Sequence, residues 1–180
     1  CRLVPYCSKV CQKVDWPIHK LFCSLEVEST YSGKGSTTTA AKVNAFLLPQ
    51  DDVNPKLVSL VLLESDNQVS YSGFGIGETD KIRSDLYTDE SIRNLKHAYH
   101  IVFKENFLND GSIQNRCVLN LFKKKAKQQG AATLFSKITE SHWRGDILIL
   151  KSTATSTPTS GNYFDITLAD VTEAVNFLYS

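Results

Sequence analysis

The chain has 180 residues, of which 42% are hydrophobic and 22% are charged, and its formal net charge at pH 7 is +1. These values are typical of a soluble globular protein. A charge so close to neutral gives no bulk attraction for nucleic acid or for a membrane surface. The longest apolar run, residues 57–63, is far too short to span a bilayer. We therefore expect a globular protein that does not enter a membrane and for which nucleic acid is an unlikely partner.

Four of the five cysteines lie in the first 23 residues, at Cys1, Cys7, Cys11 and Cys23, together with His19. Thiolates and an imidazole at such spacings suit a tetrahedral Zn²⁺ site. Two pairs of these donors are four residues apart, so each pair falls on one face of a helical turn and can supply half of a site. Disulfide bonds are the alternative. The odd cysteine count, the absence of a signal peptide and the absence of N-glycosylation acceptors favour a reducing intracellular compartment, the nucleus or the cytoplasm.

Three segments are expected along the chain: the cysteine-rich residues 1–23, a flexible linker at 24–41 and a second domain at 42–180. In the first segment, Asp-Trp-Pro at 15–17 indicates a helix start, because proline is tolerated in a first turn. The linker is rich in Ser, Thr and Gly, which bury too little apolar area to fix one conformation. Residues 152–161 have a similar composition and are expected to form a long surface loop.

The second domain is expected to be α+β. Apolar, β-branched runs bounded by turn residues predict strands, and the turn at 65–67 predicts a hairpin. The strands do not alternate with helices in a regular βαβ rhythm, which favours α+β over a doubly wound sheet. The expected strands are residues 43–48, 57–63, 69–72, 100–104 and 147–150.

Three helices are predicted in the second domain, starting at Thr88, Ser112 and Thr167, all residue types that cap helices. The second is expected to end before Gly130. In the third, Asp170 lies three residues after the threonine, close to a capping box. The residues expected on the buried faces are Ile92, Leu95 and Tyr99 in the first helix, Ile113, Cys117 and Leu121 in the second, and Val171, Val175 and Leu178 in the third.

The stretch from Cys1 to Cys23 resembles the second half of a MYND zinc finger. The matching features are Tyr-Cys-Ser-Lys at 6–9, Cys-Gln at 11–12, Asp-Trp-Pro at 15–17, and then His19 and the last cysteine. These motifs are specific in combination, but they cover only the first eighth or so of the chain. The remainder is similar to uncharacterised regions that follow MYND fingers in fungal proteins, and that weaker resemblance implies no activity.

The family's pattern has seven cysteines and one histidine that hold two Zn²⁺ ions. The resemblance therefore implies that three cysteines precede Cys1 and that this chain is a piece of a longer protein. It implies that Cys7 and Cys11 complete one zinc site with two of the upstream cysteines. Cys1, His19 and Cys23 would belong to the other site, with one upstream partner. Both ligand sets are incomplete within this chain.

In this family the finger binds short proline-containing peptides through a glutamine and a tryptophan, which match Gln12 and Trp16. An indole face packs well on proline, and a side-chain amide can bond the peptide backbone. The alternatives are that Trp16 packs as core between helices and that Gln12 is an exposed helical residue without a role. We expect Cys117, which stands alone in an apolar context, to be a buried core residue.

The sequence thus predicts a zinc-binding protein interaction protein and not an enzyme, since it contains no recognised catalytic motif. The lysine run at 123–127 is explained by its place at a helix C-terminus. One alternative is a piece of a SET-type lysine methyltransferase with an inserted MYND finger. The Asn-His-Ser-Cys motif of those enzymes is absent from residues 24–180. Another alternative is that the second domain is a binding module for a small ligand.

Overall fold

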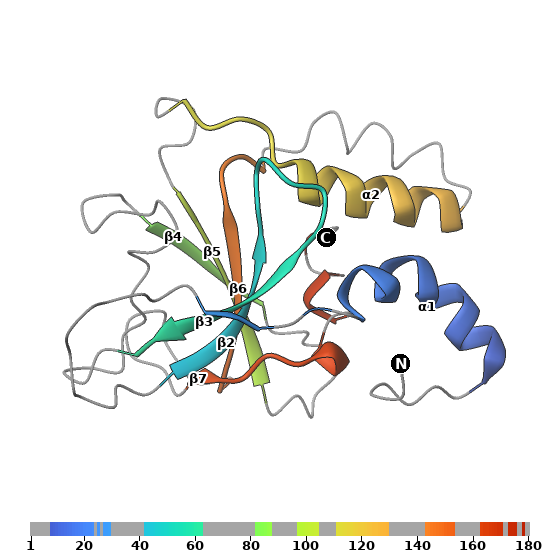
Figure 1. Cartoon of the computed structure of the whole chain (residues 1–180), viewed down its shortest axis with the longest axis horizontal. Helices are drawn as coiled ribbons and strands as arrows, with labels where there is room; N and C mark the ends of the chain where they lie inside the picture. The colour runs from blue at the N-terminus through green and yellow to red at the C-terminus, as the bar shows by residue number, and fades with distance from the viewer. Residues whose placement is uncertain are drawn as a thin grey trace.

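The computed structural model describes residues 8–23, 25, 27–29, 42–62, 82–87, 97–104, 111–129, 143–153, 163–170, 173–175 and 178. These residues form a sheet with two long helices beside it (Figure 1). The helices are α1 (Lys9–Phe22) and α2 (Arg116–Gln129), with a short 3₁₀ turn, η2 (Leu168–Asp170), near the C-terminus. The strands are β1 (Val27–Ser29), β2 (Lys42–Leu48), β3 (Lys56–Val61), β4 (Ile82–Tyr87), β5 (His97–Lys104), β6 (Ile147–Thr153) and β7 (Tyr163–Phe164).

The sheet is almost entirely antiparallel. Its strand order is β1-β3-β2-β6-β5-β4. Strand β7 pairs with the C-terminal part of β6, on the same side of β6 as β2, which pairs with the N-terminal part. Among the strands that the structure describes, only the β1–β3 pair is parallel. Helices that pack on a largely antiparallel sheet confirm the α+β class expected from the sequence. Among the described residues, no helix is long and apolar enough to cross a membrane.

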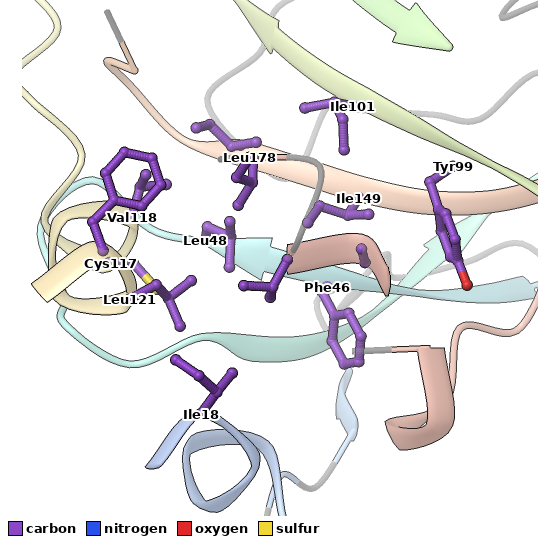
Figure 2. Packing of buried hydrophobic residues seen from close by; sticks show 14 of the residues in the cluster. Ile18, Phe46, Leu48, Tyr99, Ile101, Cys117, Val118, Leu121, Ile149 and Leu178 are labelled. Carbon is purple, nitrogen blue, oxygen red and sulfur yellow. The ribbon is translucent and has the colours of Figure 1, made fainter. Parts of the chain in front are cut away.

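One face of the sheet is covered by the helices. Alternate residues of β2, β5 and β6 point to this face, as the two-residue period of a strand requires. They pack against α1, α2 and the C-terminal segment in one cluster (Figure 2). The sheet residues of this cluster are Phe46, Leu48, Tyr99, Ile101, Phe103, Ile147 and Ile149.

The opposite face of the sheet is buried as well. The other set of alternate residues forms a second cluster there: Val43, Ala45, Leu47, Val58, Leu60, Val102, Leu148 and Leu150. A strand that is buried on both faces needs apolar residues at consecutive positions, which explains the continuous apolar runs of β2 and β6. The strands predicted at 43–48, 57–63, 100–104 and 147–150 are confirmed, with ends shifted by a few residues.

Helix α2 is held by a buried asparagine at its N-terminus. Asn115 Oδ1 accepts a hydrogen bond from the Val118 N–H at 2.8 Å, the geometry of a helix N-cap. Its Nδ2 donates to the carbonyls of Leu48 and Gly145, both at 2.8 Å. The predicted start at Ser112 is therefore wrong: the helix begins at Arg116. Asn115 is the better cap because its amide also satisfies two carbonyls from distant parts of the chain.

Two other predicted helix positions need correction. Ile113 was expected on the buried face of α2, but it precedes the helix and is 51% exposed. Tyr99 was expected on a helix from Thr88, but it lies in β5. Its hydroxyl contacts the carboxylates of Asp170 and Glu173 at 3.0 and 3.1 Å. The other residues of that predicted helix, and the hairpin predicted at 65–72, lie outside the described residues.

The C-terminal segment keeps part of the predicted capping box. The Thr167 N–H donates to Asp170 Oδ2 at 2.8 Å, which is the contact that the third residue of a capping box makes. The turn that follows is the 3₁₀ turn η2, and helical residues recur at 173–175. Val175 and Leu178 are buried in the helix-covered cluster as predicted, whereas Val171 lies outside the described residues.

The N-terminal segment is part of the same fold as the sheet. Ile18 and Phe22 of α1 belong to the helix-covered cluster, and the Phe22 ring meets Phe46 of β2 edge-on with centroids 5.1 Å apart. Val27–Ser29, inside the predicted linker, forms β1 and pairs with Leu57–Ser59. A flexible linker over all of 24–41 is therefore wrong at these three residues. The rest of that segment, apart from Leu25, lies outside the described residues.

Candidate metal and peptide site on helix α1

Helix α1 starts earlier than the sequence suggested. Ser8 is its N-cap, and the Ser8 hydroxyl accepts a hydrogen bond from the Cys11 N–H at 3.2 Å. The predicted start at residues 15–17 is wrong, because Pro17 lies inside the helix. An interior proline costs about 3 kcal/mol of helix stability. Burial of Ile18 and Phe22 in the turn that follows offsets this cost.

Three of the five expected metal ligands lie in the described part of the chain, all on or next to α1. Cys11 is half-buried, and the Ser8 hydroxyl lies 3.3 Å from its sulfur. In the structure the Cys11 sulfur is disulfide-bonded, whereas Cys23 is a half-buried free thiol. His19 is 3% exposed. Cys1 and Cys7 lie outside the described residues.

The three described donors cannot share a single zinc ion. Cys11 and His19 are eight residues apart on one continuous helix, which separates them by about 12 Å along the helix axis. Ligands of one tetrahedral zinc lie about 2.0–2.3 Å from the metal. His19 and Cys23, by contrast, are one turn apart on the same side of the helix. The geometry therefore separates Cys11 from the His19–Cys23 pair, and the described residues contain no cluster of three metal-binding side chains.

The surroundings of His19 favour the use of one particular ring nitrogen. Its Nδ1 lies 3.7 Å from Asp15 Oδ2, one helical turn earlier. The Trp16 ring stacks on the imidazole with centroids 5.9 Å apart and an interplanar angle of 28°. A carboxylate beside one nitrogen of a histidine typically orients the other nitrogen toward a metal. Thiol and imidazole donors are the ligand types that Zn²⁺ prefers, and with Nδ1 beside the carboxylate, Nε2 is the His19 nitrogen that would face a metal.

The two residues expected to contact a peptide are both on the surface. Gln12 is exposed, and Trp16 is 46% exposed. Trp16 is therefore not a core residue between helices, which was one of the two interpretations of the sequence. The two side chains are four residues apart and lie on the same flank of the helix.

Two exposed valines on α1 were missed by the sequence analysis. Val10 is 69% exposed and Val14 is 62% exposed, and they are one turn apart. Their spacing of four residues continues the row of Ile18 and Phe22, so the helical period alone would have predicted burial; they are exposed because only the later turns of α1 reach the core. Large exposed apolar side chains that gather on one element are typical of interaction surfaces. The part of α1 before Pro17 therefore presents Val10 and Val14 on one flank and Trp16 on another.

The fifth cysteine is structural. Cys117 lies in α2, is fully buried in the helix-covered cluster and is a free thiol, as the sequence predicted. Burial raises the pKa of its thiol well above the usual value, and the Asp52 carboxylate adds to the rise. A neutral, enclosed thiol is neither a metal ligand nor a reactive nucleophile.

The opposite face of the sheet contains a buried polar group. His100 Nε2 and the Ser152 hydroxyl are 3.0 Å apart, and the Tyr163 hydroxyl lies 3.4 Å from His100 Nδ1. Burial lowers the pKa of the His100 imidazole. His100 and Ser152 are almost completely shielded from solvent, so a substrate could not reach them. These contacts satisfy buried polar atoms and do not form a catalytic site.

Comparison with known proteins agrees with the sequence resemblance. Residues 1–23 match the model of the MYND finger family, so the chain begins with a MYND-type zinc finger sequence. The "SET domain and MYND-type zinc finger protein 6" of Schizosaccharomyces pombe is 38% identical over 58 residues, which is 32% of this chain and 12% of that protein. The human "N-lysine methyltransferase SMYD2" is 28% identical over 114 residues, which is 59% of this chain and 24% of that protein.

Both alignments are longer than the finger, so each extends into the region after residue 23. The matched regions span at most about a quarter of either relative. No solved structure matches the chain. The matches support a zinc-binding finger of the interaction type, and they decide neither for nor against an enzyme.

Proposed function

We propose that the finger of this protein binds zinc and docks a protein partner through a short proline-containing peptide. The observation that carries this proposal is the exposure of Gln12 and Trp16 on one flank of α1. The same helix is fixed to the sheet by Ile18 and Phe22. A rigid helix with an exposed indole is a good docking element, because little conformational entropy is lost when the peptide binds.

The zinc ligands are Cys7 and Cys11 for one ion, and Cys1, His19 and Cys23 for the other. Cys11 ligates as a thiolate, so its disulfide has to be reduced before zinc binds. Each set needs further ligands beyond these five to reach the four of a tetrahedral zinc. The distance of about 12 Å along the helix between Cys11 and His19 supports this division. Bound zinc would supply folding energy for the first 23 residues. A metal with four protein ligands has no open position for a substrate, so its role is structural.

The peptide would lie along the flank of α1 that carries Gln12 and Trp16. The Trp16 indole packs on a proline ring and keeps an apolar contact at low entropic cost. The Gln12 amide bonds the peptide backbone, which a proline-rich segment leaves unpaired. Zinc next to His19 holds the imidazole on which Trp16 stacks, so metal binding also positions the indole.

Capture of a fluorescent proline-containing peptide tests this proposal. We expect Trp16→Ala in the zinc-loaded protein to lose most of the binding, because hot-spot aromatics typically contribute about 2 kcal/mol or more, roughly a 30-fold change in Kd. Phe164→Ala is the matched control, since Phe164 is 40% exposed but lies in β7, away from α1. Unchanged binding by a folded, zinc-loaded Trp16→Ala variant would remove the tryptophan from the contact surface.

A lysine methyltransferase is the second candidate function. It is favoured by the printed descriptions of the two relatives, one of which names a SET domain and the other a lysine methyltransferase. The chain aligns with only 12% and 24% of those proteins, and it lacks the Asn-His-Ser-Cys motif after the finger. A binding assay with labelled S-adenosylmethionine decides between the candidates: specific binding would favour the enzyme.

A further inference from the structure

The two long helices carry a large share of the positive charge of the chain. Together α1 and α2 contain eight cationic side chains and a single carboxylate, that of Asp15, for a net charge of +7. The whole chain carries only +1, so all its other residues together carry −6. A near-neutral total therefore conceals a strongly positive helical layer.

The cations on each helix form a stripe. Lys9, Lys13 and Lys20 are all exposed, and their spacing of four and then seven residues places them on one face of α1. This face points away from Ile18 and Phe22. Asp15, the acidic residue of α1, is mostly buried next to His19 and does not lie on the stripe.

Helix α2 repeats this arrangement. Arg116, Lys123 and Lys127 are exposed and lie seven and then four residues apart, opposite the buried face of the helix. The Arg116 guanidinium donates a hydrogen bond to the Asp51 carbonyl at 2.7 Å. It also lies close enough to the Asp52 carboxylate for the two opposite charges to attract each other. The lysines are therefore the more available charges of this stripe.

Both stripes lie on the solvent side of the helical layer, each opposite the buried face of its own helix. Helices α1 and α2 pack against each other and cover the same face of the sheet (Figure 1). Ile18 of α1 and Leu121 of α2 face each other across the contact (Figure 2). Because both helices bury their faces in a common core, both cationic stripes lie on the outside of the same layer. The exposed Trp16, Val10 and Val14 lie beside the α1 stripe.

We propose that this layer binds an acidic segment that continues from the proline-containing peptide, so that α2 extends the docking surface of the finger. The proposal rests on the proposed function. Charge complementarity selects an acidic partner, and the apolar side chains beside the lysines suit a peptide that carries both carboxylates and apolar groups. A long nucleic acid fits less well, because it would extend past the helices and meet the net charge of −6 on the remainder of the chain.

Two labelled peptides test the proposal with the zinc-loaded protein. Both contain the same proline-containing core, which is followed by glutamates in one and by glutamines in the other. We expect the glutamate peptide to bind more tightly at low salt, and we expect this advantage to shrink as salt screens the charges. Lys123→Gln should weaken the glutamate peptide about two- to fivefold and leave the glutamine peptide unchanged.

Lys42→Gln is the matched control, because Lys42 is exposed but lies in β2, outside the helical layer. Equal affinity for the two peptides would overturn the acidic-segment proposal while leaving peptide docking intact. An equal loss in Lys42→Gln and Lys123→Gln would also overturn it, because the attraction would then be unspecific. If neither peptide binds, the proposed function itself fails. Tighter, Lys123-dependent binding of a thymine oligonucleotide would instead identify a nucleic acid partner and overturn the proposal.

Discussion

Helices α1 and α2 have the same length, 14 residues, and cover the same face of the sheet, but they are anchored differently. Helix α2 is buried along most of its length, and its buried residues are Cys117, Val118, Leu121, Phe122 and Ala126. Helix α1 is buried only from Ile18 onward, and the part before Pro17 exposes Val10, Val14 and Trp16. One helix is therefore a structural support. The other joins the core at its C-terminal end and leaves its N-terminal end exposed to solvent.

This difference explains how a small metal site can be held rigidly. A finger of 23 residues has too little apolar core to be stable alone. Here its helix shares the core of the larger domain through Ile18 and Phe22, and β1 follows directly along the chain to join the sheet. A metal held by the proposed ligands would therefore add to an anchor that the shared core already gives α1.

The largest expected effect tests whether α1 is part of the core. Phe22→Ala should destabilise the whole protein by about 3–5 kcal/mol, because it leaves a cavity against Phe46. Phe122→Ala in α2 is the matched variant and should cost a similar amount. Chemical denaturation followed by circular dichroism measures both values. A Phe22→Ala protein whose sheet unfolds at the wild-type denaturant concentration would mean that α1 is a separate unit.

The next effect concerns the cap that positions α2. Asn115→Ala should cost about 1–3 kcal/mol, because it removes the cap acceptor and leaves the carbonyls of Leu48 and Gly145 without their donor. Asn115→Ser keeps a side-chain oxygen that can accept at the cap and loses the amide donors without adding a charge, so it separates the two contributions. If Asn115→Ala lowers the free energy of unfolding no more than an exposed surface substitution does, Asn115 does not have this role.

The next prediction concerns His100, which lies on the face of the sheet opposite to the two helices and so tests the sheet without involving either helix. Burial lowers the pKa of His100 in the folded protein below its ordinary value of 6.5. The unfolded chain therefore binds more protons as the pH falls through 6.5, and the folded protein loses stability until the lowered folded pKa is reached. The slope contributed by His100 is at most about 1.4 kcal/mol per pH unit. Denaturation at several pH values should give a shallower slope for His100→Gln, and an unchanged slope would contradict the assignment.

The smallest effect is expected in the exposed half of α1. Val10→Ala should change stability by less than about 0.5 kcal/mol, as is usual for surface substitutions, and alanine is also the better helix former. The same denaturation experiment measures it. A loss as large as that of Phe22→Ala would mean that the first half of α1 is packed against the protein and is not a docking surface.

Much of the fold was accessible from local patterns. The strands β2, β3, β5 and β6 follow from apolar runs, and the buried residues Cys117 and Leu121 follow from the helical period. Helix starts were harder to predict, because Ser112 and Asn115 are both good caps by residue type. Asn115 is the cap because its amide also bonds Leu48 and Gly145, and these contacts are not visible in the local sequence.

The sequence indicates the chemistry of the candidate site but not how the site is attached to the rest of the fold. The donor residues and the exposure of Gln12 follow from motif and spacing. The core contacts of Phe22 and the pairing of Val27–Ser29 with β3 are long-range, so the sequence suggested a linker where a strand lies. Pro17 was misleading for the same reason, because packing of the following turn keeps the helix intact through the proline.

The central claim is that the cysteines of the N-terminal segment, and not the cysteine of the core, hold metal. Zinc affinity of wild type, Cys23→Ala and Cys117→Ala tests it most directly, since Cys23 is a half-buried thiol beside α1 and Cys117 is buried in α2. We expect Cys23→Ala to weaken zinc binding by more than about tenfold, because even outer-shell changes often cost that much. Cys117→Ala should bind zinc as wild type does. Equal affinity of all three proteins, or a loss confined to Cys117→Ala, would contradict the account.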